Sequence, residues 1–501
     1  MILLVSPASA TSKSWLPSSG TWNDNSHWSG NAAPASTTDA TIDNGGSVLV
    51  PTAVSGAARD LYLGNSNSGT LIISGGSIAN SNSYLGYGQG SSGSATVSSG
   101  TWSHSSWLIV GNSGTGTLNV EGGTVLSNTG YIGSNGDSIG TATLSGGTWS
   151  SQSLCVGHSG NGTLNLEKDG VVSVQGGAGN LDLAEQDAST GILNLGTGAS
   201  AGTLRAASVT GGAGAATVNF NHTGGYTFAP QLSGTLTVNQ LGSGTTVLTG
   251  SSNFTGAANV SAGRLEVNGS LSAASPVSVH IGATLAGSGR VRGTVAVNGT
   301  LEGTLTTGAI SGSGLISPGN SPGILTADSV EISTGIDFAF EFTLPDSSPI
   351  YSAPTASGND LLLLTGATPF SGDLTTDNTI RIYLKSAAAG TTYLGGFFTG
   401  LSATALETAV KNAQFEFYVE DELNGTISFN GKKYTPLSKA LLSLGATYVT
   451  NAAFLNGITE GSELTLAVLP EPGAWALLIA GMGALAFARR KKCCGRKATE
   501  M

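Results

Sequence analysis

Cysteine and charge are both scarce in this 501-residue chain. Of the three cysteines, Cys155 stands alone and Cys493 and Cys494 adjoin each other, which excludes a disulfide framework and leaves stability to packing. Only 10% of the residues are charged, against about 25% in typical proteins, which excludes a charge-rich disordered chain. Before Arg489 there are 13 basic and 29 acidic residues, a net charge of −16. Because such a surface repels phosphates, no nucleic acid partner is expected.

Residue patterns typical of catalysis and of metal binding are also sparse. Glycoside hydrolysis needs two carboxylates across a cleft, but acids are rare in most of the chain's repeats. The densest acidic group there, Asp182, Glu185 and Asp187, allows at most a weak Ca²⁺ site. No histidine has the cysteine or carboxylate spacing of a zinc site; the five are His27, His104, His158, His222 and His280. We therefore predict no catalytic, cofactor-binding or metal-binding residues, and a protein that is not an enzyme.

Glycine, in contrast, accounts for 76 residues, about twice the usual share, and it marks a repeat. Five segments between Leu61 and Val172 align on regularly spaced glycines: Gly64, Gly86, Gly111, Gly133 and Gly157. An aliphatic residue precedes each glycine, and the strand that follows alternates apolar residues with Thr, Asn and Ser. One such unit cannot bury its apolar face alone. The pattern therefore predicts an all-β fold, a parallel β-helix or solenoid of 22–25-residue repeats.

Tryptophans occupy two kinds of position in this pattern. Trp102 and Trp149 stand where other repeats have aliphatic residues, so we expect them to pack in the core or at a corner rather than to stack on sugars. Near the N-terminus, the segment SGTWNDNSHWSG carries Trp22 and Trp28 ahead of a strand predicted at 47–50. We interpret it as an aromatic cap that covers the open end of the solenoid.

The repeats resemble the autotransporter-associated β-strand repeats of bacterial surface proteins. Two further stretches carry the resemblance: GTLEGTLTTGAISGSGLISPGNSPGILTADS at 299–329, which is similar to the end of an autotransporter passenger stem, and DFAFEF followed by SGNDLLLL. The resemblance implies the architecture of a surface protein more directly than it implies a function.

After Thr365 the repeating pattern of the sequence changes. Strands are predicted at 381–385 and 415–419, a helix at 403–413, and a helical turn within 434–449. Composition, together with the resemblance, divides the whole chain as follows: 1–10, a truncated signal-peptide remnant; 11–58, the cap; 59–200, the solenoid repeats; 201–335, a continuing solenoid that resembles the autotransporter stem; 336–468, a β-rich C-terminal domain; 469–501, the C-terminal segment.

The C-terminal segment has three parts. Pro470, Glu471 and Pro472 precede an apolar run at 473–488, which would be about 24 Å long as a helix and is slightly short for a bilayer core of about 30 Å. A basic cluster follows, which the positive-inside bias keeps in the cytoplasm: Arg489, Arg490, Lys491 and Lys492. This arrangement resembles a PEP-CTERM sorting signal. The resemblance implies a single C-terminal transmembrane helix, transient residence in the inner membrane and processing by an exosortase.

These features favour an exported, non-enzymatic structural or adhesive protein of the cell surface or extracellular matrix, with extracellular polysaccharide as a candidate partner. Two alternatives stay open. One is a carbohydrate-active enzyme, a polysaccharide lyase or glycosidase, on the same β-helix. The other is an adhesin whose C-terminal span is never cleaved.

Overall fold

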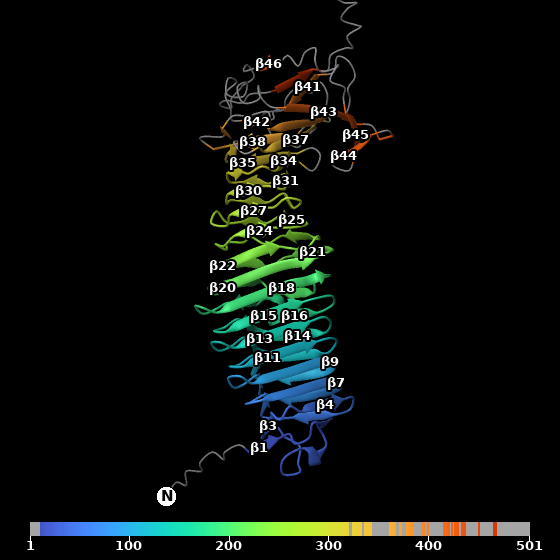
Figure 1. The fold of residues 1–501 in the computed structure, drawn as a ribbon, viewed down its shortest axis with the longest axis vertical. Helices are drawn as coiled ribbons and strands as arrows, with labels where there is room; N and C mark the ends of the chain where they lie inside the picture. The colour runs from blue at the N-terminus through green and yellow to red at the C-terminus, as the bar shows by residue number, and fades with distance from the viewer. Residues whose placement is uncertain are drawn as a thin grey trace, which may run out of the picture. The chain divides into compact units, whose positions relative to one another are not determined.

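Parallel strands stacked coil upon coil dominate the computed structural model (Figure 1). It describes the following residues: 11–319, 323–332, 335–342, 360–366, 370–372, 377–384, 392–395, 398–399, 414–420, 422–423, 425–429, 432–436, 449–450 and 464–467. The chain forms two compact units, residues 1–299 and 300–501. Helix among the described residues is limited to two 3-10 turns, η1 (Asn25–His27) and η2 (Gln175–Gly177).

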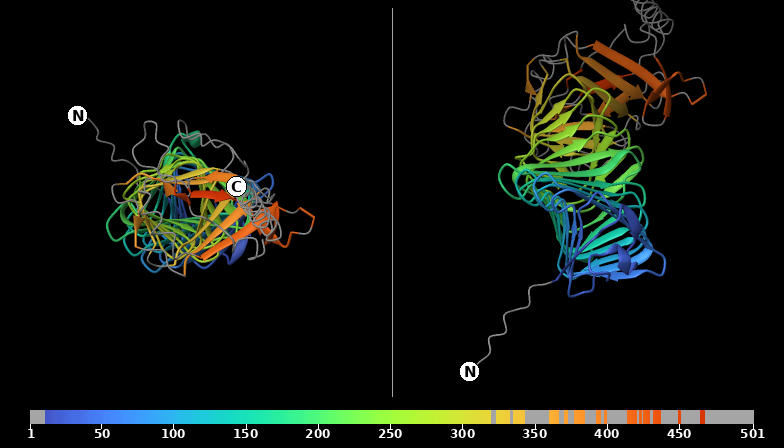
Figure 2. Two further views of the ribbon diagram at one scale, coloured as in Figure 1. Left: turned by 90° about the horizontal axis from the view of Figure 1, so that it is seen from above. Right: turned by 60° about the horizontal axis from the view of Figure 1, so that its bottom comes forward.

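The first unit is a parallel β-solenoid whose strands form ladders on successive sides of each coil, around one shared interior (Figure 2). The first ladder consists of β1 (Ser12–Ser14), β3 (Asp39–Ile42), β6 (Asp60–Leu63), β8 (Asn82–Leu85), β10 (Trp107–Val110), β12 (Thr124–Ile132), β14 (Thr148–Val156), β17 (Asn180–Leu183), β20 (Ser208–His222) and β22 (Gln231–Gln240).

The second ladder consists of β2 (Ser19–Thr21), β4 (Ser47–Pro51), β7 (Ser68–Asn80), β9 (Ser92–His104), β11 (Thr115–Val120), β13 (Ile139–Leu144), β15 (Asn161–Leu166), β18 (Thr190–Ala199), β20, β22, β24 (Ala258–Val260), β27 (Val277–Val279) and β30 (Val295–Val297). The third consists of β5 (Ser55–Ala57), β7, β9, β12, β14, β16 (Val171–Val174) and β19 (Thr203–Arg205). Long strands such as β7 turn a corner and so belong to two ladders.

Shorter strands complete the later coils of this unit. They are β21 (Gly225–Phe228), β23 (Thr245–Leu248), β25 (Arg264–Val267) and β28 (Thr284–Ala286) in one ladder, and β26 (Ser270–Leu271) and β29 (Arg290–Val291) in another.

Coil length changes along the unit. Leu164 pairs with Leu193 across one long coil, whereas Val277 pairs with Val295 across a much shorter one. The predicted 22–25-residue period therefore describes the aligned repeats but only some of the coils that follow them.

Inward-facing side chains of the same ladder position stack into continuous apolar columns. One column, fully buried, is Ile42, Leu63, Leu85, Val110, Ile132, Val156 and Leu183. Trp102 and Trp149 belong to the column of Ile78, Val125 and Val172 and have 0% exposure, which confirms that they pack in the core. Each fully buried aliphatic side chain contributes about 1.5–3 kcal/mol, so the columns replace the absent disulfides as the source of stability.

The predicted anchor glycines form the corner after each first-ladder strand. All five adopt left-handed φ angles between 66° and 76°. A Cβ on Gly111 would lie 2.5 Å from the carbonyl oxygen of Ile139 in the next coil, so glycine is needed both for the backbone angle and for the close approach of the coils. The corresponding corner of the next coil after these repeats holds Ala184 at φ 51°.

The N-terminal segment carries a cluster of buried tryptophans beside the first rungs of the ladders. Trp15, Trp22 and Trp28 are at most 2% exposed. Trp28 meets the other two edge-on, with ring centroids 5.1 Å from Trp15 and 5.0 Å from Trp22, and its indole N–H donates to the Trp22 carbonyl oxygen at 2.8 Å. These aromatic side chains bury the apolar interior next to the first rungs.

The second unit also stacks parallel strands. Its longest ladder is β31 (Thr300–Gly303), β34 (Leu315–Pro318), β37 (Asp337–Phe342), β40 (Thr379–Leu384) and β43 (Gln414–Glu420). Two more are β32 (Thr306–Thr307), β35 (Ile324–Ala327), β38 (Leu361–Leu364) and β42 (Phe398–Thr399), and β33 (Ile310–Ser311), β36 (Val330–Glu331) and β39 (Phe370–Ser371).

Apart from an isolated antiparallel bridge between Gly303 and Gly319, antiparallel pairs appear only late in the described part of this unit. They join β43 and β44 (Ile427–Phe429) to β45 (Lys432–Pro436), and β41 (Thr392–Gly395) and β46 (Val449–Thr450) to β47 (Leu464–Ala467). The strands predicted at 381–385 and 415–419 correspond to β40 and β43. The helical turn predicted within 434–449 does not include residues 434–436, which belong to β45, where Tyr434 pairs with Ile427; residues 437–448 lie outside the described residues. The helix predicted at 403–413 lies outside the described residues.

A buried carboxylate ties the second unit together. Asp360 accepts hydrogen bonds from the backbone N–H of Gly323 at 2.8 Å and of Glu341 at 2.7 Å. Burial raises the pKa of Asp360 to about 8, against the effect of these two hydrogen bonds. The residue is therefore structural, since it connects segments that are 19 and 37 residues away in the chain.

No helix among the described residues has both the length and the apolar composition that crossing a bilayer requires. The span predicted at 473–488 lies outside those residues, as does the signal-peptide remnant predicted at 1–10.

Candidate functional site

A row of aromatic side chains runs along the outer surface of the first ladder. Residues that alternate with the buried column point outward. The residue that stands two positions before each corner glycine lies in register with its equivalents in the neighbouring coils. They are Tyr62, Tyr84, Ile109, Tyr131 and Cys155. The rings of Tyr62 and Tyr84 stack with centroids 5.1 Å apart and planes inclined by 11°.

A second row is formed by the residues that follow the corner glycines. It includes Tyr87, Asn112, Ser134 and His158, whose backbone N–H groups each donate to a carbonyl of the preceding coil at 2.8–3.1 Å. These hydrogen bonds hold the corners in register. Tyr87 also places its ring edge-on against Tyr84, with centroids 5.2 Å apart.

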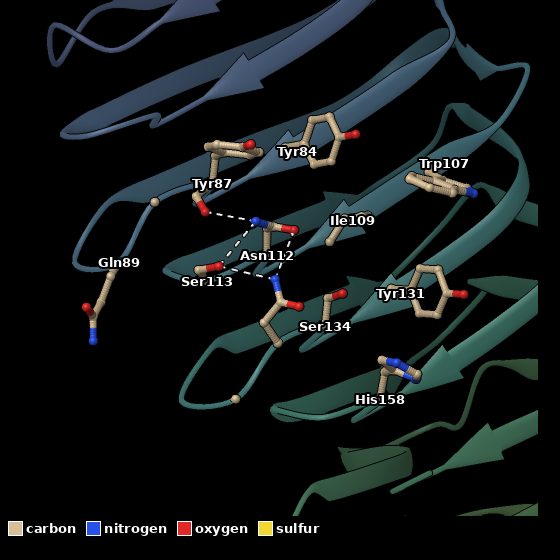
Figure 3. A pocket seen from close by; sticks show the side chains of 13 residues that line it. Tyr84, Tyr87, Gln89, Trp107, Ile109, Asn112, Ser113, Tyr131, Ser134 and His158 are labelled. Atoms are coloured by element: carbon tan, nitrogen blue, oxygen red, sulfur yellow. Dashed lines mark hydrogen bonds between the residues drawn. The ribbon is translucent and has the colours of Figure 1, made fainter. Parts of the chain in front are cut away.

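Tyr84, Ile109 and Tyr131 of the first row, together with the second row, line an open groove of about 820 Å³ on the side of the solenoid (Figure 3). Trp107, which begins β10, is 45% exposed and adds a large aromatic surface. The remaining lining residues are Gly88, Gln89, Ser113, Asn135 and Gly136. The groove thus combines exposed aromatic faces with amide and hydroxyl groups.

Amide side chains are fixed at one wall of the groove. The Asn112 amide donates to the Tyr87 carbonyl oxygen at 2.9 Å, and Asn135 donates to the Asn112 side-chain oxygen at 3.3 Å (Figure 3). Both amides also donate to the Ser113 hydroxyl, at 3.3 Å and 3.2 Å. This network orients polar groups toward the open side before any ligand arrives.

The groove is nearly free of charge. None of its lining residues is Asp, Glu, Lys or Arg. Burial, with Asp60 and Asp39 nearby, raises the pKa of Tyr62 to about 12, and burial likewise raises the pKa of Tyr84 and of Tyr131. The phenols therefore stay neutral and can donate hydrogen bonds. Neutral aromatic faces with adjacent amides suit the apolar faces and hydroxyl groups of uncharged sugars.

A cluster of titratable side chains lies at the end of the aromatic row. The Glu185 carboxylate lies 2.8 Å from Nδ1 of His158 and 3.5 Å from Sγ of Cys155. Burial, followed by the Glu185 charge, raises the pKa of the Cys155 thiol. Burial, followed by the same charge, raises the pKa of Asp182, which pairs in register with Cys155.

The acidic residues and histidines that the sequence indicated as candidates are grouped differently in the structure. Asp182, Glu185 and Asp187 do not form one site: Glu185 joins Cys155 and His158, whereas Asp187 accepts a hydrogen bond from the N–H of Ala188 at 3.0 Å. The other four histidines lie apart from this cluster in the part of the chain that the structure describes.

The aromatic row of the groove was not predicted from the sequence. Its signal is present in the segments LYLG, SYLG and GYIG, where a tyrosine stands two positions before the anchor glycine. Strand alternation places such a tyrosine on the outside whenever the next residue is in the core. The pairing of His158 with Glu185 had no comparable signal, because the two are 27 residues apart in a coil longer than the repeat.

The chain's C-terminus has a clear counterpart among known protein families. Residues 468–492 match the PEP-CTERM protein-sorting motif. The chain carries a PEP-CTERM motif. The match to this PEP-CTERM motif includes the predicted tripeptide Pro470, Glu471 and Pro472 and the basic cluster 489–492. All of these residues lie outside the described part of the structure.

One curated relative matches part of the chain. A stretch of 104 residues, 20% of the chain, is 41% identical to the adhesin BmaC autotransporter of Brucella suis biovar 1 (strain 1330). The chain spans about 3% of the length of that protein. No solved structure matches the chain significantly. Together with the PEP-CTERM motif, the similarity to an autotransporter adhesin confirms the predicted resemblance to bacterial surface proteins.

Proposed function

We propose that this chain is an exported, non-enzymatic adhesin or matrix protein that binds neutral polysaccharide in the groove between Tyr84 and His158. The PEP-CTERM motif implies processing by an exosortase and export to the cell surface or extracellular space. Adhesion is the proposed role of the solenoid. The observation that carries it is an open, uncharged groove in which exposed aromatic rings alternate with oriented amides.

Three features support a polymer as the ligand rather than a small molecule. The groove is open along its length and runs across several coils, so a chain of sugars can enter from the side. Its aromatic residues repeat from one coil to the next, which suits successive sugar rings. The net charge of −16 before Arg489 disfavours anionic polymers, so a neutral polysaccharide is the better match.

Affinity electrophoresis of the full chain tests this binding. Native gels containing a soluble neutral β-glucan or galactomannan should retard the protein, whereas gels containing the anionic polymer alginate should not. Tyr84→Ala and Trp107→Ala should each weaken the retardation roughly 2- to 12-fold, because one aromatic contact contributes about 0.5–1.5 kcal/mol beyond its buried area. The matched control is Ile281→Ala, which removes an apolar side chain that is 86% exposed and lies outside the groove.

Two results would count against the groove. One is unchanged migration of the parent chain in every neutral polysaccharide. The other is equal retardation of the parent and both aromatic variants, which would place binding elsewhere on the molecule.

The sorting steps are a separate part of the proposal. Cleavage would occur near Pro470, Glu471 and Pro472, after the span 473–488 and the basic cluster 489–492 had held the chain in the inner membrane. Intact mass of the protein from surface and medium fractions should show a new C-terminus near residue 469. Replacing Pro470 and Glu471 with alanine should preserve a full-length species in the membrane fraction. A parent chain that keeps residue 501 would favour the permanently anchored adhesin instead.

A carbohydrate-active enzyme is the second candidate, and the cluster of Cys155, His158 and Glu185 at the groove is the observation that favours it. Only His158 of these three lines the groove, and no pair of carboxylates does. Incubation with the polysaccharide that the protein binds should therefore release no new reducing ends and no unsaturated products. If the parent chain released such products and Glu185→Gln did not, the adhesin proposal would have to be replaced with an enzymatic one.

A further inference from the structure

The cluster at the end of the groove brings together three different metal-ligating groups from two adjacent coils. Cys155 comes from the end of β14, His158 from the corner that follows it, and Glu185 from the equivalent corner of the next coil. Their ligand atoms, one thiol sulfur, one imidazole nitrogen and one carboxylate oxygen, all lie within 4.8 Å of one another. We propose that Cys155, His158 and Glu185 bind a Zn²⁺ ion. This proposal is independent of polysaccharide binding.

The distance between the thiol sulfur and the carboxylate oxygen fits tetrahedral coordination. With Zn–S near 2.3 Å and Zn–O near 2.0 Å, a tetrahedral angle separates sulfur from oxygen by about 3.5 Å. The structure places Sγ of Cys155 at 3.5 Å from Oε2 of Glu185. The same carboxylate oxygen is 2.8 Å from Nδ1 of His158, so about half an ångström of side-chain movement opens the space for the ion.

The backbone holds these ligands in place without the ion. The N–H of His158 donates to the Gly133 carbonyl at 2.9 Å, and the N–H of Glu185 donates to the Gly157 carbonyl at 2.9 Å. A third hydrogen bond, from Gln186 N–H to the His158 carbonyl at 2.9 Å, joins the two corners directly. A site fixed by rigid coils loses little conformational entropy on binding.

The donor set selects zinc over calcium. Ca²⁺ prefers six to eight oxygen ligands, whereas a thiolate and an imidazole suit Zn²⁺. Binding converts the Cys155 thiol to a thiolate and releases its proton to solvent, and the thiolate and the carboxylate together balance the charge of the ion. The hydrogen bond between Nδ1 of His158 and Glu185 is replaced by two bonds to the metal, and the neutral imidazole then carries its proton on Nε2.

The fourth coordination position faces solvent. Cys155 is 4% exposed, but the side chains of His158 and Glu185 are 32% and 45% exposed. Water completes the tetrahedron there, beside the groove that His158 lines. Three protein ligands and one open position are typical of zinc sites that exchange their outer ligand.

Metal binding by the full chain in a Cys493→Ser, Cys494→Ser background tests the proposal, since that background removes the remaining thiols. Equilibrium dialysis against Zn²⁺ followed by elemental analysis should give one zinc ion per chain. Co²⁺ in place of Zn²⁺ should produce a thiolate-to-cobalt charge-transfer band and the visible spectrum of a tetrahedral site. Excess Ca²⁺ should not displace either metal.

Variants locate the ion on these residues. Cys155→Ser should abolish the charge-transfer band. His158→Asn and Glu185→Gln should each weaken Zn²⁺ affinity by more than roughly 100-fold, which is a larger loss than the removal of a residue that only hydrogen-bonds to a metal ligand would cause. The control His280→Asn, an exposed histidine on another coil, should bind like the parent. Circular dichroism of each variant without metal verifies the fold. No stoichiometric zinc in the parent, or equal binding by folded Cys155→Ser and His158→Asn, would overturn the proposal.

Discussion

At the scale of single residues, His104 is a titratable group held in the interior of the solenoid. Its ring packs against Trp102 with centroids 4.7 Å apart, and Nδ1 lies 2.9 Å from the Leu126 carbonyl oxygen. Nδ1 therefore carries the proton in the neutral ring, while Nε2 is buried without a hydrogen-bond partner. Burial lowers the pKa of His104 to about 4. The folded chain thus keeps this imidazole neutral well below the usual range.

This burial predicts acid sensitivity. Between pH 6.5 and about 4 the unfolded chain binds a proton at His104 that the folded chain does not, so the free energy of unfolding falls as the pH falls through this window. The full stabilisation is present above pH 6.5. The loss of unfolding free energy from this group reaches about 3 kcal/mol once the pH is below about 4. Urea unfolding of the full chain at pH 7.5 and at pH 4.5 should show this loss. His104→Gln should be less stable at pH 7.5 but much less sensitive to acid.

The exposed His280 supplies the comparison for that measurement. His280→Gln should keep the parent's dependence on pH. If His104→Gln loses as much stability on acidification as the parent does, the acid sensitivity arises from other groups.

At the scale of elements, asparagine amides form a ladder along the outer face of the second ladder of strands. Side-chain hydrogen bonds of 2.8–2.9 Å connect each member to the one before it, through Asn165, Asn194, Asn219, Asn239 and Asn259. Each inner member donates with its nitrogen and accepts with its oxygen. The ladder ties five consecutive coils together on the side opposite their buried residues.

Removing a central member should break two links at once. Asn219→Ala loses the bond donated to Asn194 and the bond accepted from Asn239. At about 0.5–1.5 kcal/mol for each bond, the free energy of unfolding should fall by about 1–3 kcal/mol. Denaturant unfolding of the full chain measures this. Thr217→Ala, on the same outer face of β20, is the control and should cost less. Equal losses would mean that the ladder contributes no more than ordinary outward side chains.

The same elements show how far the sequence predicts the structure. Alternation correctly placed the aliphatic residues and Trp102 inside, because whether a residue faces in or out depends only on its neighbours in the strand. The asparagine ladder and the pairing of His158 with Glu185 depend on which residues of different coils meet. Coil length varies along the unit, so no fixed period aligns them. The 3-10 turn η2, for example, lengthens the coil that carries Glu185.

At the scale of the whole first unit, stacked coils contact only their neighbours, so coils should be removable when the core columns still fit. The columns alternate in size: Trp102, Val125, Trp149 and Val172 follow one another in register. Removing two coils preserves this alternation, whereas removing one places Trp102 directly against Trp149.

Two deletions that begin after the same residue, Leu118, test whether the stacking order of the core column matters. Deleting residues 119–164 joins Leu118 to Asn165, and deleting 119–142 joins Leu118 to Thr143; both keep the alternation of the strand, because Leu118, Ala142 and Leu164 are in register. The longer deletion should retain β-sheet circular dichroism and a single cooperative unfolding transition. The protein with the shorter deletion should be less stable by about 1–3 kcal/mol, since two indole rings then occupy a space that in the parent holds one indole ring and one valine side chain. Equal stability of the two would show that the columns tolerate any stacking order, and loss of cooperative unfolding in both would mean that the coils do not act as independent neighbours.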